Sequence, residues 1–156
     1  MRVLGINMID WRTSTFKERI VWARNNLKPF RTQYCVVYDD VDMEAASVMH
    51  PDMHFMSMLM HGNLVPPYWV KLKLKEDAER PNFVDHRHLG NFELLNGITP
   101  IGSLTEEEAV EYLIKTDIPR RIWENWDKGN RRKLVICNKT QLPKTREWRD
   151  TWRIAA

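Results

Sequence analysis

Residues 33–38, Gln-Tyr-Cys-Val-Val-Tyr, form the stretch on which the fold class depends. The run is rich in β-branched and aromatic residues and ends at the acidic pair Asp39-Asp40, which is typical of a strand buried on both faces. A second apolar run, Lys-Leu-Val-Ile-Cys at residues 133–137, follows a turn at 128–130 and predicts another strand. The sequence thus predicts two strands from opposite halves of the chain.

Two segments predict amphipathic helices. Residues 15–27 begin with a capping-box pattern, Thr15 followed by Glu18, and carry apolar residues at spacings of three and four. Residues 104–115 show the same spacing, and their apolar side chains line one helix face: Leu104, Ala109, Val110, Leu113 and Ile114.

Other segments are less regular. Residues 42–60 suit two short helices with a break near Pro51, because proline interrupts a helix interior. Residues 68–74 alternate apolar and basic side chains with period two, which predicts an exposed-face strand at a sheet edge. The charged, glycine- and proline-bearing residues 75–102 predict long loops, and residues 120–127 predict a turn of helix.

The length and the order of these elements predict the fold class. A chain of 156 residues is the size of one domain, so we expect a single small domain over residues 1–156, with residues 75–102 as an internal loop region. Helices and strands do not alternate regularly enough for a doubly wound sheet. The prediction is therefore an α+β domain with a small mixed or antiparallel sheet covered by two to four helices.

The composition indicates to which broad class of protein the chain belongs. Hydrophobic residues make up 43% and charged residues 29%, as in an ordinary globular domain. No apolar run is long enough for a secretory core or a membrane span, so we expect a cytoplasmic protein without a membrane partner. In such a reducing compartment Cys35 and Cys137, each inside an apolar run, are expected to be small buried thiols rather than a disulfide.

Basic charge is concentrated at the C-terminal end. Residues 120–153 hold 11 lysines and arginines against four acidic residues, a net charge of +7. The rest of the chain has 13 basic and 17 acidic residues, or −4. A positive end attracts acidic partners such as nucleic acid or an acidic protein surface, although it also keeps a small protein in solution.

The same end interleaves basic and aromatic residues. Basic groups pair with phosphates and tryptophan faces stack on exposed bases, so this composition suits a single-strand binding surface. The alternative is that the tryptophans, such as Trp148 and Trp152 at helical spacing, bury a stripe in the core while the arginines are solvated. The candidate binding residues are Arg120, Arg121, Trp126, Arg131, Arg132, Lys133, Arg146 and Arg149.

All five histidines lie within one quarter of the chain, together with Asp52 and Asp85. A helix would place His50 and His54 on one face, and an extended segment would point His86 and His88 the same way. Two such pairs could hold a divalent metal, the only cofactor the sequence suggests, although Pro51 disturbs the first of them. Histidines in surface loops need no metal. The candidate ligands are His50, His54, His61, His86 and His88.

Acidic residues follow the first strand. Carboxylates at a strand exit hold Mg²⁺ in many α/β enzymes, but a solvated turn is the favoured explanation, because no lysine or further acidic motif can be placed beside them. They are Asp39, Asp40, Asp42 and Glu44. The sequence has no Gly-rich phosphate loop, GxSxG elbow or catalytic-triad order, so it favours a binding protein over an enzyme.

The end of the chain resembles the ending of small uncharacterised phage and prophage proteins. In these a strand is followed by Leu-Pro and then by Arg, an aromatic residue, Arg and Trp; here the strand is residues 133–137, followed by Leu142, Pro143, Arg146, Trp148, Arg149 and Trp152. The chain departs from the pattern at Trp148, where phenylalanine is usual, and at Lys144, where an acid is common. The resemblance covers at most the last third of the chain. It implies a phage origin and action in the host cytoplasm or the virion, and it implies no reaction.

Three hypotheses follow. The first is a small phage-encoded protein whose basic, tryptophan-bearing C-terminal surface contacts nucleic acid or an acidic protein. The second is a metal-dependent hydrolase or nuclease that uses the histidines with Asp52 or Asp85. The third is a virion or assembly component, whose sequence mark would be an exposed methionine-rich run from Met49 to Met60, although such a run is more often core.

Overall fold

The structure, a computed structural model, describes residues 2–3, 6–39, 46–72, 96–127 and 134–142, with the backbone alone at residues 2–3, 6–7 and 125–127. The chain divides into two compact units, each assembled from segments distant in sequence. One consists of Met1–Phe30 and His54–Thr105, and the other of Arg31–Met53 and Glu106–Ala156. The prediction of one domain with a loop region at 75–102 stays a prediction.

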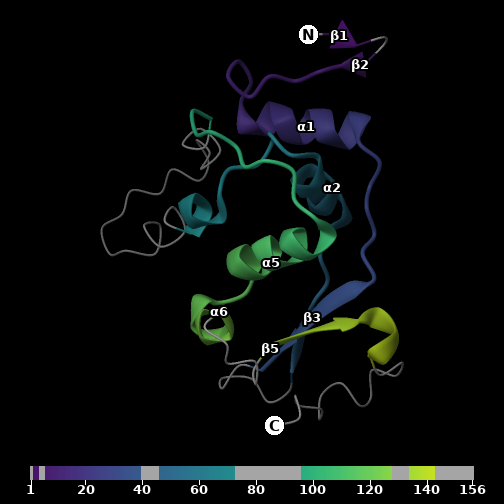
Figure 1. Ribbon diagram of the computed structural model, residues 1–156, viewed down its shortest axis with the longest axis vertical. Coiled ribbons are helices and arrows are strands. Elements are labelled where there is room, and N and C mark those ends of the chain that lie inside the picture. Colours follow the sequence, from purple (N-terminus) through teal and green to yellow (C-terminus); the bar gives the residue numbers. More distant parts are fainter. Residues whose placement is uncertain (1, 4–5, 40–45, 73–95, 128–133, 143–156) are drawn as a thin grey trace. The chain divides into compact units, whose positions relative to one another are not determined.

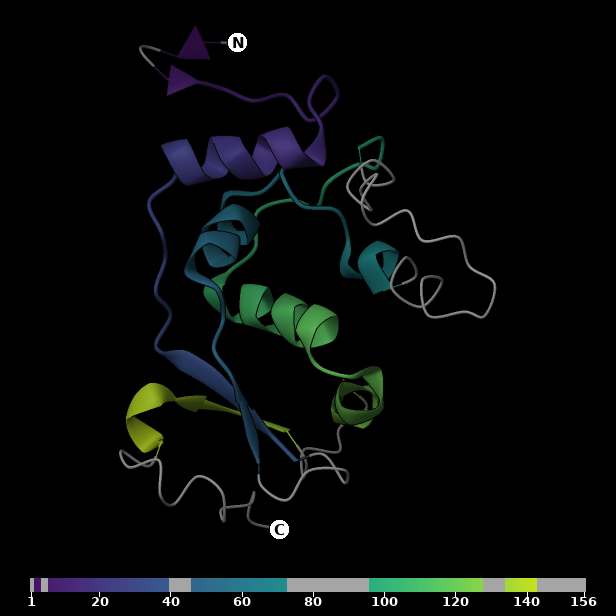
Figure 2. The same ribbon diagram turned by 180° about the vertical axis from the view of Figure 1, so that it is seen from behind.

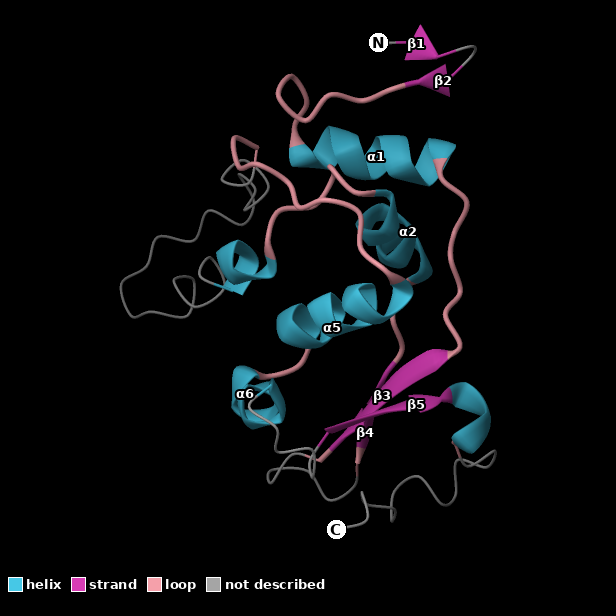
Figure 3. Ribbon diagram, in the orientation of Figure 1, coloured by secondary structure: helices cyan, strands magenta, loops and turns pink. Residues whose placement is uncertain are grey.

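The second unit contains a three-stranded antiparallel sheet in the order β4-β3-β5 (Figure 3). Its central strand β3 (Tyr34–Tyr38) pairs with β4 (Ser47–Met49) and with β5 (Leu134–Asn138). The three middle residues of β3 are at most 7% exposed, because neither face nor edge of this strand is open to solvent. Both predicted strands, and the burial of the first on both faces, are therefore confirmed, while in β5 Leu134 is buried and Val135 is exposed.

Two helices pack on this sheet. Because strand side chains alternate, Tyr34 and Val36 share one face of β3. The Tyr34 hydroxyl donates a hydrogen bond to Glu107 at 3.4 Å, so helix α5 (Glu106–Asp117) covers that face. Helix α6 (Arg120–Asp127) contacts both α5 and β5 (Figure 1). The predicted fold class is confirmed: a small α+β domain in which a three-stranded antiparallel sheet is packed with helices.

The sequence of α5 explains which of its side chains are buried and why its first turn is acidic. Four of the five side chains that the spacing placed on its apolar face are buried, since Ala109, Val110, Leu113 and Ile114 are at most 3% exposed. The fifth, Leu104, precedes the helix and is partly exposed, and Tyr112 is buried although the spacing did not predict it. Three glutamates occupy the first turn, where the positive end of the helix dipole stabilises negative charge. The Thr32 hydroxyl donates to one of them, Glu106, at 2.7 Å.

The first unit contains α1 (Phe16–Asn26), most of α2 (Met53–His61) and an antiparallel ribbon of β1 (Arg2–Val3) and β2 (Ile6–Asn7). The predicted capping box of α1 is confirmed: the Thr15 hydroxyl accepts from the Glu18 amide, and the Glu18 carboxylate accepts from the Thr15 amide. The core residues include Phe16, Ala23, Met56, Met58, Leu59, Leu64 and Val65. The sequence did not predict the ribbon.

A tight turn at Gly62 joins α2 to the segment that follows. Gly62 has a φ of +83°, a left-handed conformation, and a Cβ there would lie 2.8 Å from the Ser103 Cα. The turn lets residues 59–65 run beside residues 101–104, where the Asn63 amide donates to the Ile101 carbonyl at 2.8 Å. Glycine is therefore required at this position for a close approach of two backbones.

Two local predictions are wrong. Residues 47–49 form strand β4 rather than a helix, because Val48 and Met49 pair with Val37 and Val36 across the sheet. Residues 68–72 are helical rather than an edge strand, as Figure 2 shows beside the grey trace. The Val70 amide donates to the Pro67 carbonyl at 3.2 Å, and the fixed φ of proline suits a first helical turn.

Three smaller points complete the fold. The short 3₁₀ helix η1 (Lys139–Gln141) follows β5 and is capped by Asn138, which the sequence did not predict. Met56 and Met58 are at most 1% exposed, so these two methionines of the 49–60 run are core residues. No helix in the part of the chain that the structure describes is long and apolar enough to cross a membrane.

Candidate functional site

Helix α6 separates basic side chains from apolar ones. Arg120 and Arg121 are exposed, whereas Ile122 is 6% and Trp123 is 5% exposed. The Arg120 guanidinium carbon lies over the Trp123 ring, 5.9 Å from its centre, in a cation–π contact. Helix α6 therefore exposes two arginine side chains to solvent, while its two apolar side chains are buried.

The remaining predicted binding residues are only partly placed. Trp126 lies in α6, and its side chain is outside the described residues. Arg131, Arg132 and Lys133 also lie outside the described residues. Arg146 and Arg149 also lie outside the described part, as do Trp148 and Trp152. Of the C-terminal tryptophans, Trp123 alone has a described side chain, and it is a core residue.

The histidine prediction is contradicted at its first pair. Helix α2 begins at Met53, so His50 lies outside it and does not share a helical face with His54. Pro51, one residue after His50, ends the helical pattern there because its ring disfavours helical backbone before it. His61 is engaged locally: its Nδ1 lies 2.8 Å from the Gly62 carbonyl oxygen, and its ring meets that of Trp22 edge to face at 5.5 Å.

Metal ligands do not gather elsewhere in the described residues. His86, His88 and Asp85 lie outside them. Within them, no three side chains of His, Cys, Asp or Glu come together in a way that could hold a metal ion. Asp39 follows β3 as predicted, while Asp40, Asp42 and Glu44 are outside the described part. The metal site and the acidic site therefore stay predictions.

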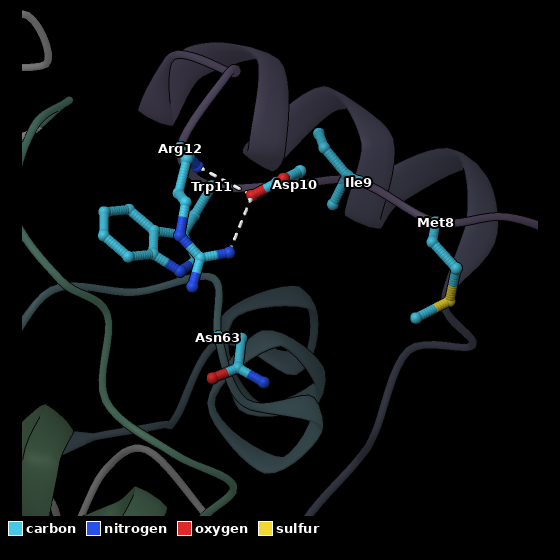
Figure 4. Close-up of a pocket in the computed structure, with 6 residues that line it drawn as sticks. All are labelled: Met8, Ile9, Asp10, Trp11, Arg12 and Asn63. Carbon is cyan, nitrogen blue, oxygen red and sulfur yellow. Dashed lines mark hydrogen bonds and ion pairs between the residues drawn. The ribbon is translucent and has the colours of Figure 1, made fainter. Parts of the chain in front are cut away.

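A pocket of about 340 Å³ lies beside the loop that leads into α1 (Figure 4). Its polar lining includes Asp10, Arg12 and Asn63. The Arg12 amide donates to the Asp10 carboxylate at 2.9 Å, and the Arg12 guanidinium lies 3.7 Å from the same oxygen. The two charges neutralise each other, and the Ser14 hydroxyl, which donates to the Asp10 carbonyl at 2.6 Å, closes the turn. This pair serves the entry into α1 and shows no catalytic arrangement.

Arg19 is a buried cation that the sequence analysis missed. Its side chain is 0% exposed, and its Nη1 donates to the Leu64 carbonyl at 2.8 Å. Among the described residues its Nε and Nη2 have no hydrogen-bond partner, and burial lowers the pKa of the guanidinium. The sequence spacing could have predicted the burial of Arg19, because Phe16, Arg19 and Ala23 lie on one face of a helix.

The two cysteines form a pair that the sequence did not predict. Cys35 on β3 and Cys137 on β5 stand opposite each other, and their sulfur atoms are 3.4 Å apart. Both are free thiols; Cys35 is 0% exposed and Cys137 is partly exposed. The prediction that they are buried is confirmed for Cys35.

Comparison with protein-family models, with curated proteins and with solved structures finds no match. The resemblance of the chain's ending to phage proteins therefore stays a prediction.

Proposed function

We propose that the chain binds nucleic acid through a basic surface made by Arg120 and Arg121 of α6 and by the basic residues that follow them, the run 131–133 and Arg146 and Arg149. The observation that carries the proposal is the division of α6, which turns Arg120 and Arg121 to solvent while Ile122 and Trp123 are buried. A helix packed in this way holds its arginines in place, so binding does not have to order the helix first.

Charge supports the same choice. Residues 120–153 carry a net charge of +7, whereas the rest of the chain carries −4. Phosphates spaced along a strand are neutralised by several cations at once, and each neutralised phosphate releases counterions. A clustered positive charge on a chain of small net charge is what such binding requires. An acidic protein surface would be attracted by the same charge and is the alternative outcome of the test.

The test is a fluorescence anisotropy titration of labelled single-stranded and double-stranded oligonucleotides at low salt. The double variant Arg120→Glu with Arg121→Glu is compared with the control Lys17→Glu with Lys28→Glu, which makes the same charge change at two exposed positions of the other unit. We expect the α6 variant to weaken binding at least tenfold and the control to change it less than threefold, since Arg120 and Arg121 belong to the proposed surface and the two control lysines do not.

The proposal fails if neither oligonucleotide binds at tens of micromolar protein, roughly the range expected of non-specific binding. It also fails if both double variants weaken binding equally, because the effect would then come from net charge alone. Binding to an acidic protein with no binding to oligonucleotides would assign the surface to the alternative partner.

A further inference from the structure

We infer that Cys35 and Cys137 are a site of reversible oxidation, at which a low-molecular-weight disulfide such as oxidised glutathione converts the facing thiols into a disulfide joining β3 to β5. The inference is independent of nucleic-acid binding, because it rests on the pairing of the two strands.

The register of the sheet places the two backbones at the right separation. The Lys139 amide donates to the Gln33 carbonyl at 2.8 Å, so these residues form a hydrogen-bonded pair. Pairs alternate along an antiparallel ladder, and Cys35 with Cys137 lies two steps further on, which makes it a hydrogen-bonded pair as well. Cα atoms in such a pair are about 5.5 Å apart, within the range of about 4.4–6.8 Å found across disulfides.

The side chains are also directed toward each other. The Sγ–Sγ distance is 3.4 Å, so the sulfur atoms must approach by about 1.4 Å to reach bonding distance. The central strand β3 is anchored on both sides, by β4 and by β5. Bond formation therefore requires small torsional changes at two side chains rather than a rearrangement of the sheet.

The chemistry is two successive thiol–disulfide exchanges. Cys137 is the partly exposed thiol, so its thiolate attacks the small disulfide first, forming a mixed disulfide and releasing one small thiolate. The Cys35 thiol then loses its proton and attacks the Cys137 sulfur, which expels the second small thiolate. Overall, the two protein thiols lose two electrons and two protons, and the small disulfide takes up both to become two thiols.

The environment of Cys35 determines the rate of the second exchange. Its pKa is raised to about 12, first by burial and then by the hydrogen bond and the charge of Cys137. The last two causes vanish once Cys137 is in a mixed disulfide, so its own reaction makes Cys35 easier to ionise. Because the thiolate is the attacking species, closure of the protein disulfide should accelerate as the pH rises through the neutral range.

The test uses the full chain, incubated with oxidised glutathione, blocked with an alkylating reagent and digested with trypsin. Cleavage after Arg31 and Lys133 separates the two cysteines, so the expected product joins the peptide that begins at Thr32 to peptide 134–139. We expect the number of free thiols to fall from two to none without a cross-link between chains, and dithiothreitol to restore both. Cys35→Ser, which keeps the accessible thiol alone, should instead retain glutathione on Cys137.

Two outcomes would overturn the inference. One is wild-type protein that keeps both thiols, or keeps glutathione on Cys137 without closing the protein disulfide. The other is a disulfide between two chains. Neither outcome depends on the folding of a variant, because the decisive measurement is made on the wild-type chain.

Discussion

Replacement of Arg19 with methionine tests the account of the buried core in the first unit. Arg19 is 0% exposed and donates a hydrogen bond to the Leu64 carbonyl, while its Nε and Nη2 have no hydrogen-bond partner within the part of the chain that the structure describes. Methionine keeps an unbranched stem and removes the charge. The substitution therefore exchanges a poorly satisfied ion for an apolar side chain at a site already lined by Phe16, whose ring centre lies 5.4 Å from the guanidinium carbon.

The opposing free-energy contributions can be compared. Loss of the bond to the Leu64 carbonyl costs about 1.5–3 kcal/mol, as for a hydrogen bond to a charged group. Removal of two buried donors that lack a partner among the described residues restores about 1–3 kcal/mol each, a gain that already includes the desolvation of the ion. We therefore expect Arg19→Met to raise the free energy of unfolding by about 1–3 kcal/mol.

Urea unfolding followed by tryptophan fluorescence measures the change. The matched control is Arg24→Met, an exposed position of the same helix, which should change the free energy of unfolding by less than about 0.5 kcal/mol. A loss of more than about 1 kcal/mol in Arg19→Met, with the control unchanged, would refute the reasoning, because it would show that the guanidinium is well satisfied in solution.

Three further predictions concern stability. Gly62→Ala should lower the free energy of unfolding by at least about 1–2 kcal/mol because of the left-handed backbone, and the clash with the facing segment adds to this loss. The control Gly97→Ala should be nearly neutral, since a Cβ there meets open space, and urea unfolding of both variants measures the difference. Leu113→Ala should cost about 2–4 kcal/mol through the cavity it leaves, and a change below about 0.5 kcal/mol would disprove its place in the core. The pKa of Glu18 is lowered by its hydrogen bonds with Thr15, so this stabilisation is present above the unfolded value of 4.5 and is lost as pH falls through the lower folded value. Glu18→Gln should therefore lose less stability than wild type over that acid range, as acid titration of thermal unfolding would show.

Local signals predicted the elements that depend on local chemistry. The capping box of Thr15 and Glu18 and the apolar spacing of residues 104–115 located α1 and α5, because both patterns act within one or two helical turns. The pairing of β4 with β3 depends on a neighbouring strand rather than on the residues of β4 alone, and it overrode the helical preference of the preceding alanines. The alternation in residues 68–72 misled in the same way, since the prolines before it started a helix.

The candidate sites were predictable to a smaller extent. The basic composition that includes Arg120 and Arg121 was visible in the sequence, but their exposure depends on which side of α6 packs inward. The contact of Cys35 with Cys137 follows from the register of strands from opposite halves of the chain, which no local pattern specifies. A one-residue shift of that register would move the two sulfur atoms to opposite faces of the sheet.

The salt dependence of oligonucleotide binding tests the central claim most directly. If the surface binds by neutralising phosphates, the logarithm of the association constant for a single strand falls linearly with the logarithm of salt concentration, with a slope of about −0.7 for each phosphate neutralised. The variant Arg131→Glu with Arg132→Glu should then flatten the slope by about 1.4, as two lost phosphate contacts require. An affinity that does not change with salt, or a slope identical in wild type and variant, would contradict the account.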